Sequence, residues 1–258
     1  MNGRKISITA LAVTFAILAS SLLFAEPSGR EIIDNVYNRP TGKDAQSKLT
    51  MTLINSRGAT RERVIDQYFK DYGETEKTVM FFSSPADVRD TSFMNWSYDD
   101  GRGDDQWIYL PALKRVKRIS SDSKGDYFMG SDFTYDDLGD RHPSEDQHRM
   151  LRTESIGKDT VYVVESIPRE DDYIYSRTVT WVVKDKWIGL KKEFYDEDGD
   201  LLKTLAIRNV EKISGYWVLT DLEMHNVQED HTTKIELRDV RLDSGVSDDM
   251  FSERMMRR

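Results

Sequence analysis

The chain contains no cysteine among its 258 residues. This absence excludes disulfide bonds, cysteine nucleophiles, thiolate metal sites and the acylated cysteine that anchors lipoproteins. The chain also has no nucleophile elbow, no phosphate-binding glycine loop, and no histidine and acid placed beside a serine. We therefore expect a protein that is not an enzyme, although a pair of carboxylates formed across two strands would leave no linear motif.

Histidine is scarce as well, with four residues in the whole sequence. His142 and His148 bracket Glu145 and Asp146, but this spacing matches no known metal site. A polar surface loop explains the cluster better than a metal centre does. We expect neither a bound metal nor a cofactor.

The chain is acidic, with a formal net charge of −9. It begins with a short segment containing Arg4 and Lys5, continues with an uncharged apolar run at residues 6–24, and reaches Ala25 before the polar Glu26. This pattern predicts a secretory signal peptide at residues 1–25, with an uncleaved membrane anchor as the alternative. Removing its two cations gives −9 − 2 = −11, which argues against nucleic acid as a partner. We expect the mature protein in the periplasm.

Hydrophobic periodicity predicts a mainly β protein with short helices. Residues 28–37 have helical spacing, with Ser28 as the N-cap. Beyond them Leu49, Met51 and Leu53 alternate with polar residues, and about a dozen such runs are joined by hairpin turns. We expect a single domain at residues 26–258, built from a curved antiparallel sheet with one apolar face. Such a sheet encloses either a solid core or a ligand cavity, and the sequence leaves both open.

The stretch at residues 105–138 has the most uneven composition. Its basic run has two interpretations, the soluble outer face of an edge strand or a docking surface for lipid phosphates or an acidic partner. The aromatic run that follows, with Phe128, Met129 and Phe133, either packs over the open end of a barrel or forms a mobile lid.

The two halves of this stretch also resemble a known family. Residues 107–119 read WIYLPALKRVKRI and residues 128–138 read FMGSDFTYDDL, and together they are similar to the signature of the outer-membrane lipoprotein-sorting proteins, the LolA-like periplasmic carriers. The likeness covers nearly the whole mature chain. It implies an unclosed antiparallel β-barrel of about 11–12 strands, capped by short helices, whose apolar interior shelters lipid.

The resemblance implies a carrier or chaperone that moves the acyl chains of lipoproteins or other lipids between envelope membrane proteins. Its partners would be an inner-membrane exporter of the resistance-nodulation-division or ABC type and an outer-membrane acceptor. A non-carrier adaptor of such an exporter is the alternative function. The predicted lipid-binding residues are Trp96, Trp107, Tyr109, Phe128, Met129, Phe133 and Trp181. The predicted partner-docking residues are Lys114, Arg115, Lys117 and Arg118.

Overall fold

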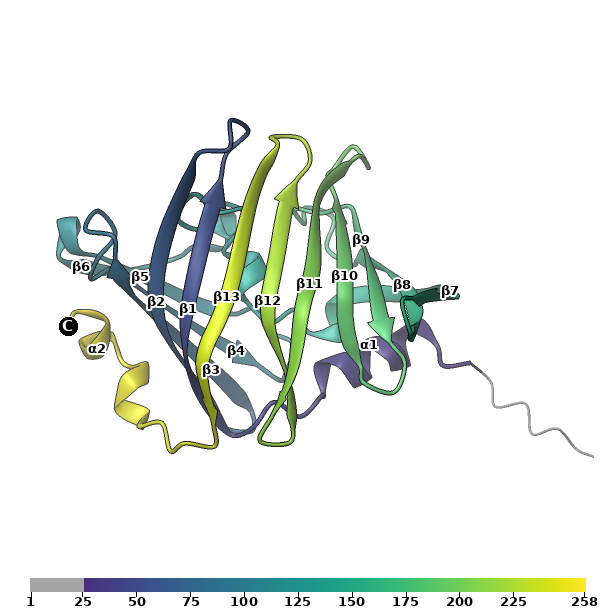
Figure 1. Ribbon diagram of the computed structural model, residues 1–258, viewed down its shortest axis with the longest axis horizontal. Helices are drawn as coiled ribbons and strands as arrows, with labels where there is room; N and C mark the ends of the chain where they lie inside the picture. The colour runs from purple at the N-terminus through teal and green to yellow at the C-terminus, as the bar shows by residue number, and fades with distance from the viewer. Residues whose placement is uncertain (1–25) are drawn as a thin grey trace, which may run out of the picture.

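The computed structural model describes residues 26–258, so the predicted signal peptide lies outside the described residues. These residues form one antiparallel sheet of thirteen strands (Figure 1). The strands are β1 (Asp44–Ile54), β2 (Thr60–Asp71), β3 (Thr75–Ser84), β4 (Ser92–Tyr98), β5 (Asp105–Leu110), β6 (Arg115–Arg118), β7 (Asp146–Ile156), β8 (Asp159–Pro168), β9 (Arg177–Val183), β10 (Ile188–Tyr195), β11 (Leu201–Ile213), β12 (Tyr216–Asn226) and β13 (His231–Leu242).

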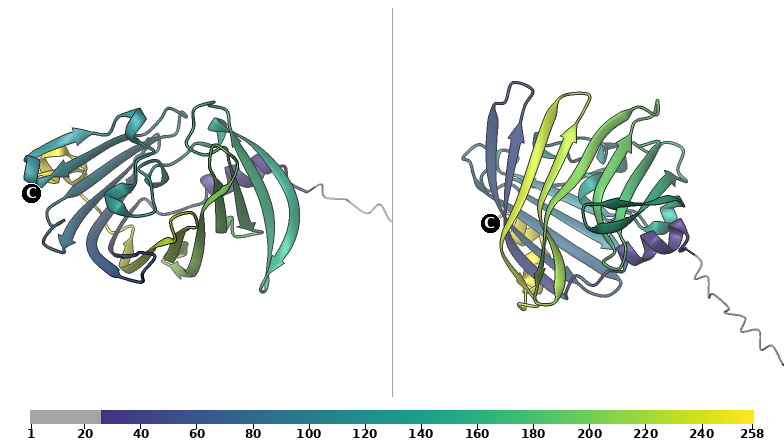
Figure 2. Two further views of the ribbon diagram at one scale, coloured as in Figure 1. Left: turned by 90° about the horizontal axis from the view of Figure 1, so that it is seen from above. Right: turned by 45° about the vertical axis from the view of Figure 1, so that its right-hand side comes forward.

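The sheet is open. Its strand order is β6-β5-β4-β3-β2-β1-β13-β12-β11-β10-β9-β8-β7, so β6 and β7 are free edges. Neighbouring strands follow one another in the sequence, except for β1 and β13. Viewed from above, the sheet curves into a trough (Figure 2). The prediction of an unclosed antiparallel barrel with short helices is confirmed.

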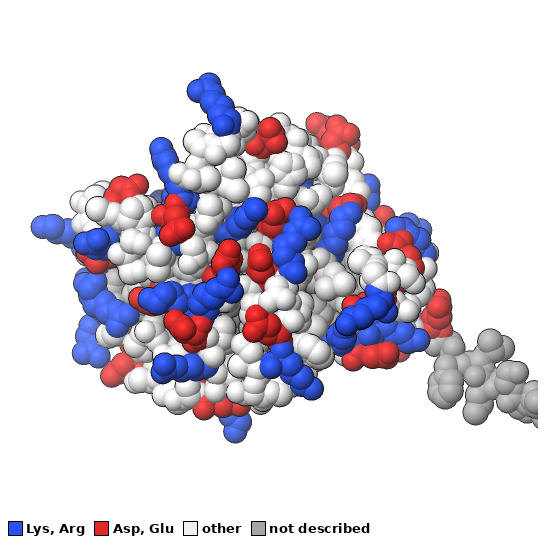
Figure 3. Space-filling view, in the orientation of Figure 1, with Lys and Arg blue, Asp and Glu red and all other residues white. Residues whose placement is uncertain are grey.

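Alternation along the strands gives the two faces of the sheet different chemistry. In β1, Leu49, Met51 and Leu53 are buried on the concave side, while Lys48 points outward and pairs with Asp66 of β2 at 3.1 Å. The convex surface of the central strands consequently carries Lys, Arg, Asp and Glu side by side (Figure 3). Interspersed charges of this kind keep one face of a sheet in water while the other face packs.

A short helix, α1 (Gly29–Tyr37), lies against β7 and β8. It begins with a capping box, because the Ser28 hydroxyl accepts a hydrogen bond from the Glu31 amide while the Glu31 carboxylate accepts one from the Ser28 amide. Ile32 is fully buried with Tyr162, Val164 and Val182. The predicted helix at residues 28–37 is therefore confirmed.

The chain from β6 to β7 leaves the sheet and enters the trough (Figure 2). We call residues 127–138 the plug. It contains the 3-10 turns η3 (Phe128–Gly130) and η4 (Asp136–Leu138). Phe128 is fully buried, with ring centroids 5.1 Å from Phe93 and 5.9 Å from Phe82 on the concave side of β4 and β3. The concave core is thus closed by an inserted segment and not by the strands alone.

The C-terminal segment, residues 246–256, covers the opposite face of β3 to β5. It includes η6 (Asp248–Phe251) and α2 (Glu253–Met256). Phe251 and Met256 pack with Val79, Phe81 and Met94. Within residues 26–258, no helix has the length and apolar character needed to span a membrane.

Candidate functional site

The concave trough is the candidate site, because hollows remain around the plug. One has a volume of about 700 Å³ and lies between the end of α1, the ends of β2, β3 and β4, and the chain that leaves the plug. A second, of about 280 Å³, is lined by β1, β2, β12 and β13. A third, of about 260 Å³, lies between the plug and β8 to β12. We call them the acidic hollow, the apolar annex and the inner cavity.

A buried ion pair fastens the plug to the sheet. Lys203 of β11 is fully buried, and its Nζ donates to Asp137 Oδ2 at 2.5 Å and to the Asp132 carbonyl at 3.0 Å. The other oxygen of Asp137 accepts from the Tyr175 hydroxyl at 2.9 Å. Burial, and then the charge of Asp137, raises the pKa of Tyr175 far above its ordinary value, so Tyr175 remains a donor. A buried pair satisfied in this way positions a segment well, but it leaves a costly unpaired charge when either partner is lost.

A second polar contact holds the middle of the plug. The Asp132 carboxylate accepts from the Thr233 hydroxyl at 2.6 Å and lies 2.8 Å from His231 Nδ1, both on β13. The Asp132 amide donates back to the Thr233 oxygen at 2.9 Å. The plug therefore rests both on the buried rings of Phe128 and Phe133 and on polar contacts to β11 and β13.

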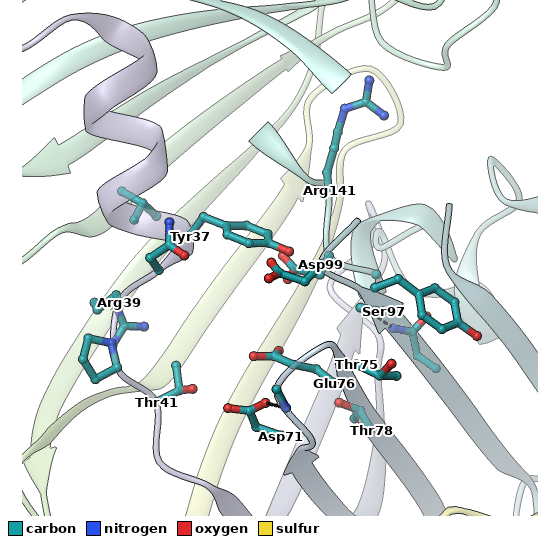
Figure 4. A pocket seen from close by; sticks show the side chains of 18 of the residues that line it. Tyr37, Arg39, Thr41, Asp71, Thr75, Glu76, Thr78, Ser97, Asp99 and Arg141 are labelled. Carbon is teal, nitrogen blue, oxygen red and sulfur yellow. Dashed lines mark hydrogen bonds between the residues drawn. The ribbon is translucent and has the colours of Figure 1, made fainter. Parts of the chain in front are cut away.

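The acidic hollow collects carboxylates from four separate parts of the chain. Tyr37 extends across it from the end of α1 toward Asp99, while Glu76 and Asp71 lie on the wall formed by β2 and β3 (Figure 4). Asp140 joins them from the segment that follows the plug. Because these residues come from distant elements, only the folded sheet brings them together.

Crowding and burial change the protonation of these acids. Burial raises the pKa of Glu76 from its ordinary 4.5 to about 7, with further contributions from Asp140 and Asp71. Burial also raises the pKa of Asp140 from 3.8 to about 6, and the charge of Asp104 adds to the rise. The raised pKa values mean that cations in the hollow do not compensate the carboxylates fully.

The apolar annex adjoins the acidic hollow. The two share the lining residues Arg39, Thr41, Glu76 and Thr78. The apolar side chains that line the annex are Ala45, Phe69, Trp217, Val218, Leu219, Leu237, Val240 and Leu242. The two adjoining spaces therefore differ in character, because carboxylates gather around the hollow and apolar side chains predominate around the annex.

The inner cavity is smaller and mixed in character. Phe133 of the plug faces Phe194, Leu205 and Met224 across it. Lys192 also lines this cavity, and burial lowers its pKa. The inner cavity is therefore only partly suited to an apolar group, because several carboxylates also line it.

The structure divides the predicted lipid-binding residues between the two faces of the sheet. Phe128 and Phe133 lie in the concave core, and Met129 packs against it. Trp96, Trp107 and Tyr109 lie on the convex face beneath the C-terminal segment, where Trp96 and Trp107 form an edge-to-face pair with centroids 5.1 Å apart. Alternation explains the division, because Trp96 is the outward neighbour of Asn95 and Ser97, which line the acidic hollow.

Trp181 also lies away from the trough. It packs with Val161, Val163 and Val179 on the outer side of β8 and β9, and its indole nitrogen donates to Glu154 at 2.6 Å. None of Trp96, Trp107, Tyr109 and Trp181 lines a described hollow. Aromatic residues in a strand thus predict that the strand is packed against something, but they do not predict on which face of the sheet the aromatic rings lie.

The predicted docking residues lie together at a free edge of the sheet. Lys114 follows the 3-10 turn η1 (Pro111–Leu113), and β6 carries Arg115, Lys117 and Arg118. All four side chains are exposed. Arg118 pairs with Asp105 of the neighbouring strand, whereas the other three form no ion pair within residues 26–258.

Sequence reasoning missed the residues of the acidic hollow. Tyr37, Glu76, Asn95 and Asp140 stand alone in the sequence among ordinary helix, strand and turn residues. The alternation of β3 was the one signal that could have revealed them. Glu76 and Thr78 fall on the same alternate positions as Met80 and Phe82, which places a carboxylate on the buried face of the strand.

Comparison with known proteins agrees with this architecture. A family model described as DUF1329, a protein family of unknown function, matches residues 2–140, and a second model, described as an uncharacterized protein, matches residues 74–258. The chain belongs to the DUF1329 family. No match to a curated protein was found.

Two crystal structures extend the match over most of this DUF1329 chain. A domain from Vibrio parahaemolyticus that is described as an outer-membrane lipoprotein-sorting protein domain is 35% identical, with a TM-score of 0.84, covering 89% of this chain and 98% of that one. A DUF1329 protein from Desulfovibrio piger is 31% identical, with a TM-score of 0.83, covering 88% and 97%.

A more distant structure shows the same fold. A LolA superfamily protein from Nitrosomonas europaea is 19% identical, with a TM-score of 0.69, covering 89% of this chain and 100% of that one. The DUF1329 chain therefore has a LolA-like fold, and the family resemblance seen in residues 107–138 is confirmed.

Proposed function

We propose that this DUF1329 protein is a non-enzymatic periplasmic carrier that binds acyl chains of lipoproteins or other lipids on the concave face of its half-barrel. One observation carries the proposal: the apolar interior is closed by a separate segment, the plug. Strands joined edge to edge cannot part without breaking backbone hydrogen bonds, whereas an inserted segment moves by giving up side-chain contacts. The match to a lipoprotein-sorting domain points the same way.

The apolar annex is the natural first place for an acyl chain. Its volume of about 280 Å³ is open without any movement of the plug, and most of its lining residues are aliphatic or aromatic, beside Arg39, Glu76 and four neutral polar residues. Burial of apolar surface stabilises a complex by roughly 25 cal/mol per Å² before ordering costs are subtracted. Longer or multiple chains would need the space that Phe128 and Phe133 occupy.

Transfer to another protein would use the free edge at β6. Lys114, Arg115 and Lys117 present three cations without carboxylate partners within the described residues. An edge strand can also receive a strand of a partner through its unpaired backbone groups. An exporter or acceptor with an acidic edge would fit this surface.

The test is native mass spectrometry of protein released gently from the periplasm, together with binding of a fluorescent fatty acid. Ser47 lines the annex on β1, so Ser47→Trp should fill it and weaken fatty-acid binding at least about tenfold. The next residue, Lys48, points outward, and Lys48→Trp is the matched control that should bind normally.

Two results would contradict the carrier. Protein that carries no lipid and binds no fatty acid would favour the adaptor function, especially if an exporter is recovered with it. Equal binding by wild type, Ser47→Trp and Lys48→Trp would remove the annex as the site.

A further inference from the structure

The acidic hollow offers acceptors in excess of donors. Its carboxylates come from the residues Asp71, Glu76, Asp99 and Asp140, with Asp104 close behind. Of the three cations in its wall, Arg141 is paired with carboxylates, whereas Arg39 bonds only a carbonyl and Lys43 has no ion pair within the described residues. Arg39 donates to the Trp217 carbonyl at 2.7 Å, and Arg141 pairs with Asp146 at 2.7 Å.

A buried amide adds an unpaired acceptor to the hollow, and a second lines a smaller neighbouring space of about 30 Å³. Asn95 is 4% exposed and lines the hollow, and its Oδ1 has no hydrogen-bond partner within the described residues. Its orientation is fixed because Nδ2 donates to Asp104 Oδ2 at 3.0 Å, and a carboxylate accepts only. Gln106, directly across from Asn95 in β5, is 1% exposed and has an unpaired Oε1, while its Nε2 donates to the Tyr135 carbonyl at 2.7 Å.

An unpaired buried acceptor is costly, so Asn95 Oδ1 indicates a missing donor in the hollow. Within residues 26–258 no group of three or more histidine or acidic side chains lies close enough to hold a metal ion. The acids surround a space of about 700 Å³ instead of converging on a point. The complementary ligand is an organic cation with several N–H donors.

We propose that the acidic hollow binds the ammonium group of an amine-bearing amphiphile whose apolar tail lies in the adjoining annex. This inference rests on the proposed carrier function and names the head group of its cargo. Glu76 is the central residue, because it lines both the hollow and the annex, where head and tail of one molecule would meet.

The charged and titratable groups that face Glu76 set the pH dependence. Asp71 comes from β2, Asp99 and Asp104 come from the turn between β4 and β5, and Asp140 and Arg141 come from the segment after the plug. Tyr37 ends α1, and Arg39 and Lys43 lie between α1 and β1. With pKa values of about 7 for Glu76 and about 6 for Asp140, these two acids lose charge between neutral and mildly acid pH. An alkylammonium ion keeps its charge over that range, so its preferential binding should fade as the pH falls.

The experiment compares four probes on the intact mature protein by calorimetry: dodecylamine, dodecanol, laurate and hexylamine. At about pH 8 dodecylamine should bind at least about tenfold more tightly than dodecanol or laurate, and the preference should shrink at about pH 5. Hexylamine, with the same head and a shorter tail, should bind more weakly than dodecylamine.

Variants locate the effect. Glu76→Gln should remove most of the preference for amine over alcohol, so that dodecylamine and dodecanol bind the variant with similar affinity. Glu74→Gln is the matched control, since Glu74 is exposed and outside the hollow lining, and it should bind like wild type. Thermal melting confirms that each variant is folded before binding is measured.

The outcomes separate the two proposals. Equal binding of amine, alcohol and carboxylate would overturn the head-group site and leave the carrier intact. Hexylamine binding as tightly as dodecylamine would support the head-group site and overturn the tail in the annex. Absence of binding by all four probes would overturn both.

Discussion

Two segments outside the sheet, the plug and the C-terminal segment, cover opposite faces of the same strands in different ways. The C-terminal segment seals the convex face of β3 to β5 with apolar side chains such as Phe251 and Met256, and no described hollow adjoins that contact. The plug places rings in the trough but depends on Lys203 and Asp132 for its attachment, and hollows surround it. Apolar packing tolerates no gap, whereas a few polar anchors hold a segment beside space that a ligand can use. We therefore expect loss of the C-terminal segment's contacts to affect mainly stability, and loss of the plug's contacts to affect lipid binding as well.

The largest effect should follow from breaking the anchor of the plug. Lys203→Met leaves Asp137 buried without its cation and should lower the free energy of unfolding by about 3–5 kcal/mol. The loosened plug should also admit fatty acid more readily. Urea unfolding and fluorescent fatty-acid binding measure the two effects. Lys192→Met on the neighbouring strand removes a lysine without an ion pair among the described residues, and its cost should be much smaller.

The next effect tests the other segment. Phe251→Ala removes a 4% exposed ring from the convex cluster and should lower the free energy of unfolding by about 3 kcal/mol. Fatty-acid binding should stay unchanged because this cluster does not face the trough. Increased lipid uptake by Phe251→Ala would show that the two segments share one function.

A smaller effect should appear in the pH dependence of stability. The folded pKa of Glu76, about 7, lies above its ordinary 4.5, so the folded state holds a proton that the unfolded state has lost. The stability that this proton provides is complete below about pH 4.5 and disappears as the pH rises through about 7. Glu76→Gln should therefore stabilise the protein by about 2 kcal/mol at pH 8 and hardly at all at about pH 4. Glu74→Gln should show no such difference, and a pH-independent effect of Glu76→Gln would contradict the assignment.

The smallest effect on folding concerns the free edge. Reversing Lys114, Arg115 and Lys117 to Glu should change the free energy of unfolding by no more than about 0.5 kcal/mol, because all three are exposed. Transfer of lipid to membranes or partner proteins should nevertheless slow. The control reverses the exposed Lys158, Lys184 and Lys212, which lie on other hairpins, and normal transfer by the edge variant would return β6 to a purely solubilising role.

Local patterns sufficed to predict the helix at residues 28–37, the strands and a curved antiparallel sheet, because each depends on period and turn chemistry along the chain. That the sheet stays open was implied by the family resemblance. The site required distances between segments that no local pattern contains. Trp96 and Asn95 are neighbours, yet one faces the C-terminal segment and the other the acidic hollow. The large aromatic residues were predicted to bind lipid. A large hydrophobic side chain predicts that the residue is buried, but it does not predict on which face of the sheet. The interpretation of Phe128 as packing gains support from its complete burial, while movement of the plug stays a prediction.

The central claim is that acyl chains bind on the concave face, and photocrosslinking tests it most directly. A fatty acid with a photoreactive group near the end of its tail would be bound to the mature protein, irradiated and mapped by peptide mass spectrometry. We predict labelling of annex residues such as Phe69 and Leu237, which lie on β2 and β13. Labelling confined to the convex residues around Trp107 or Trp181 would contradict the account.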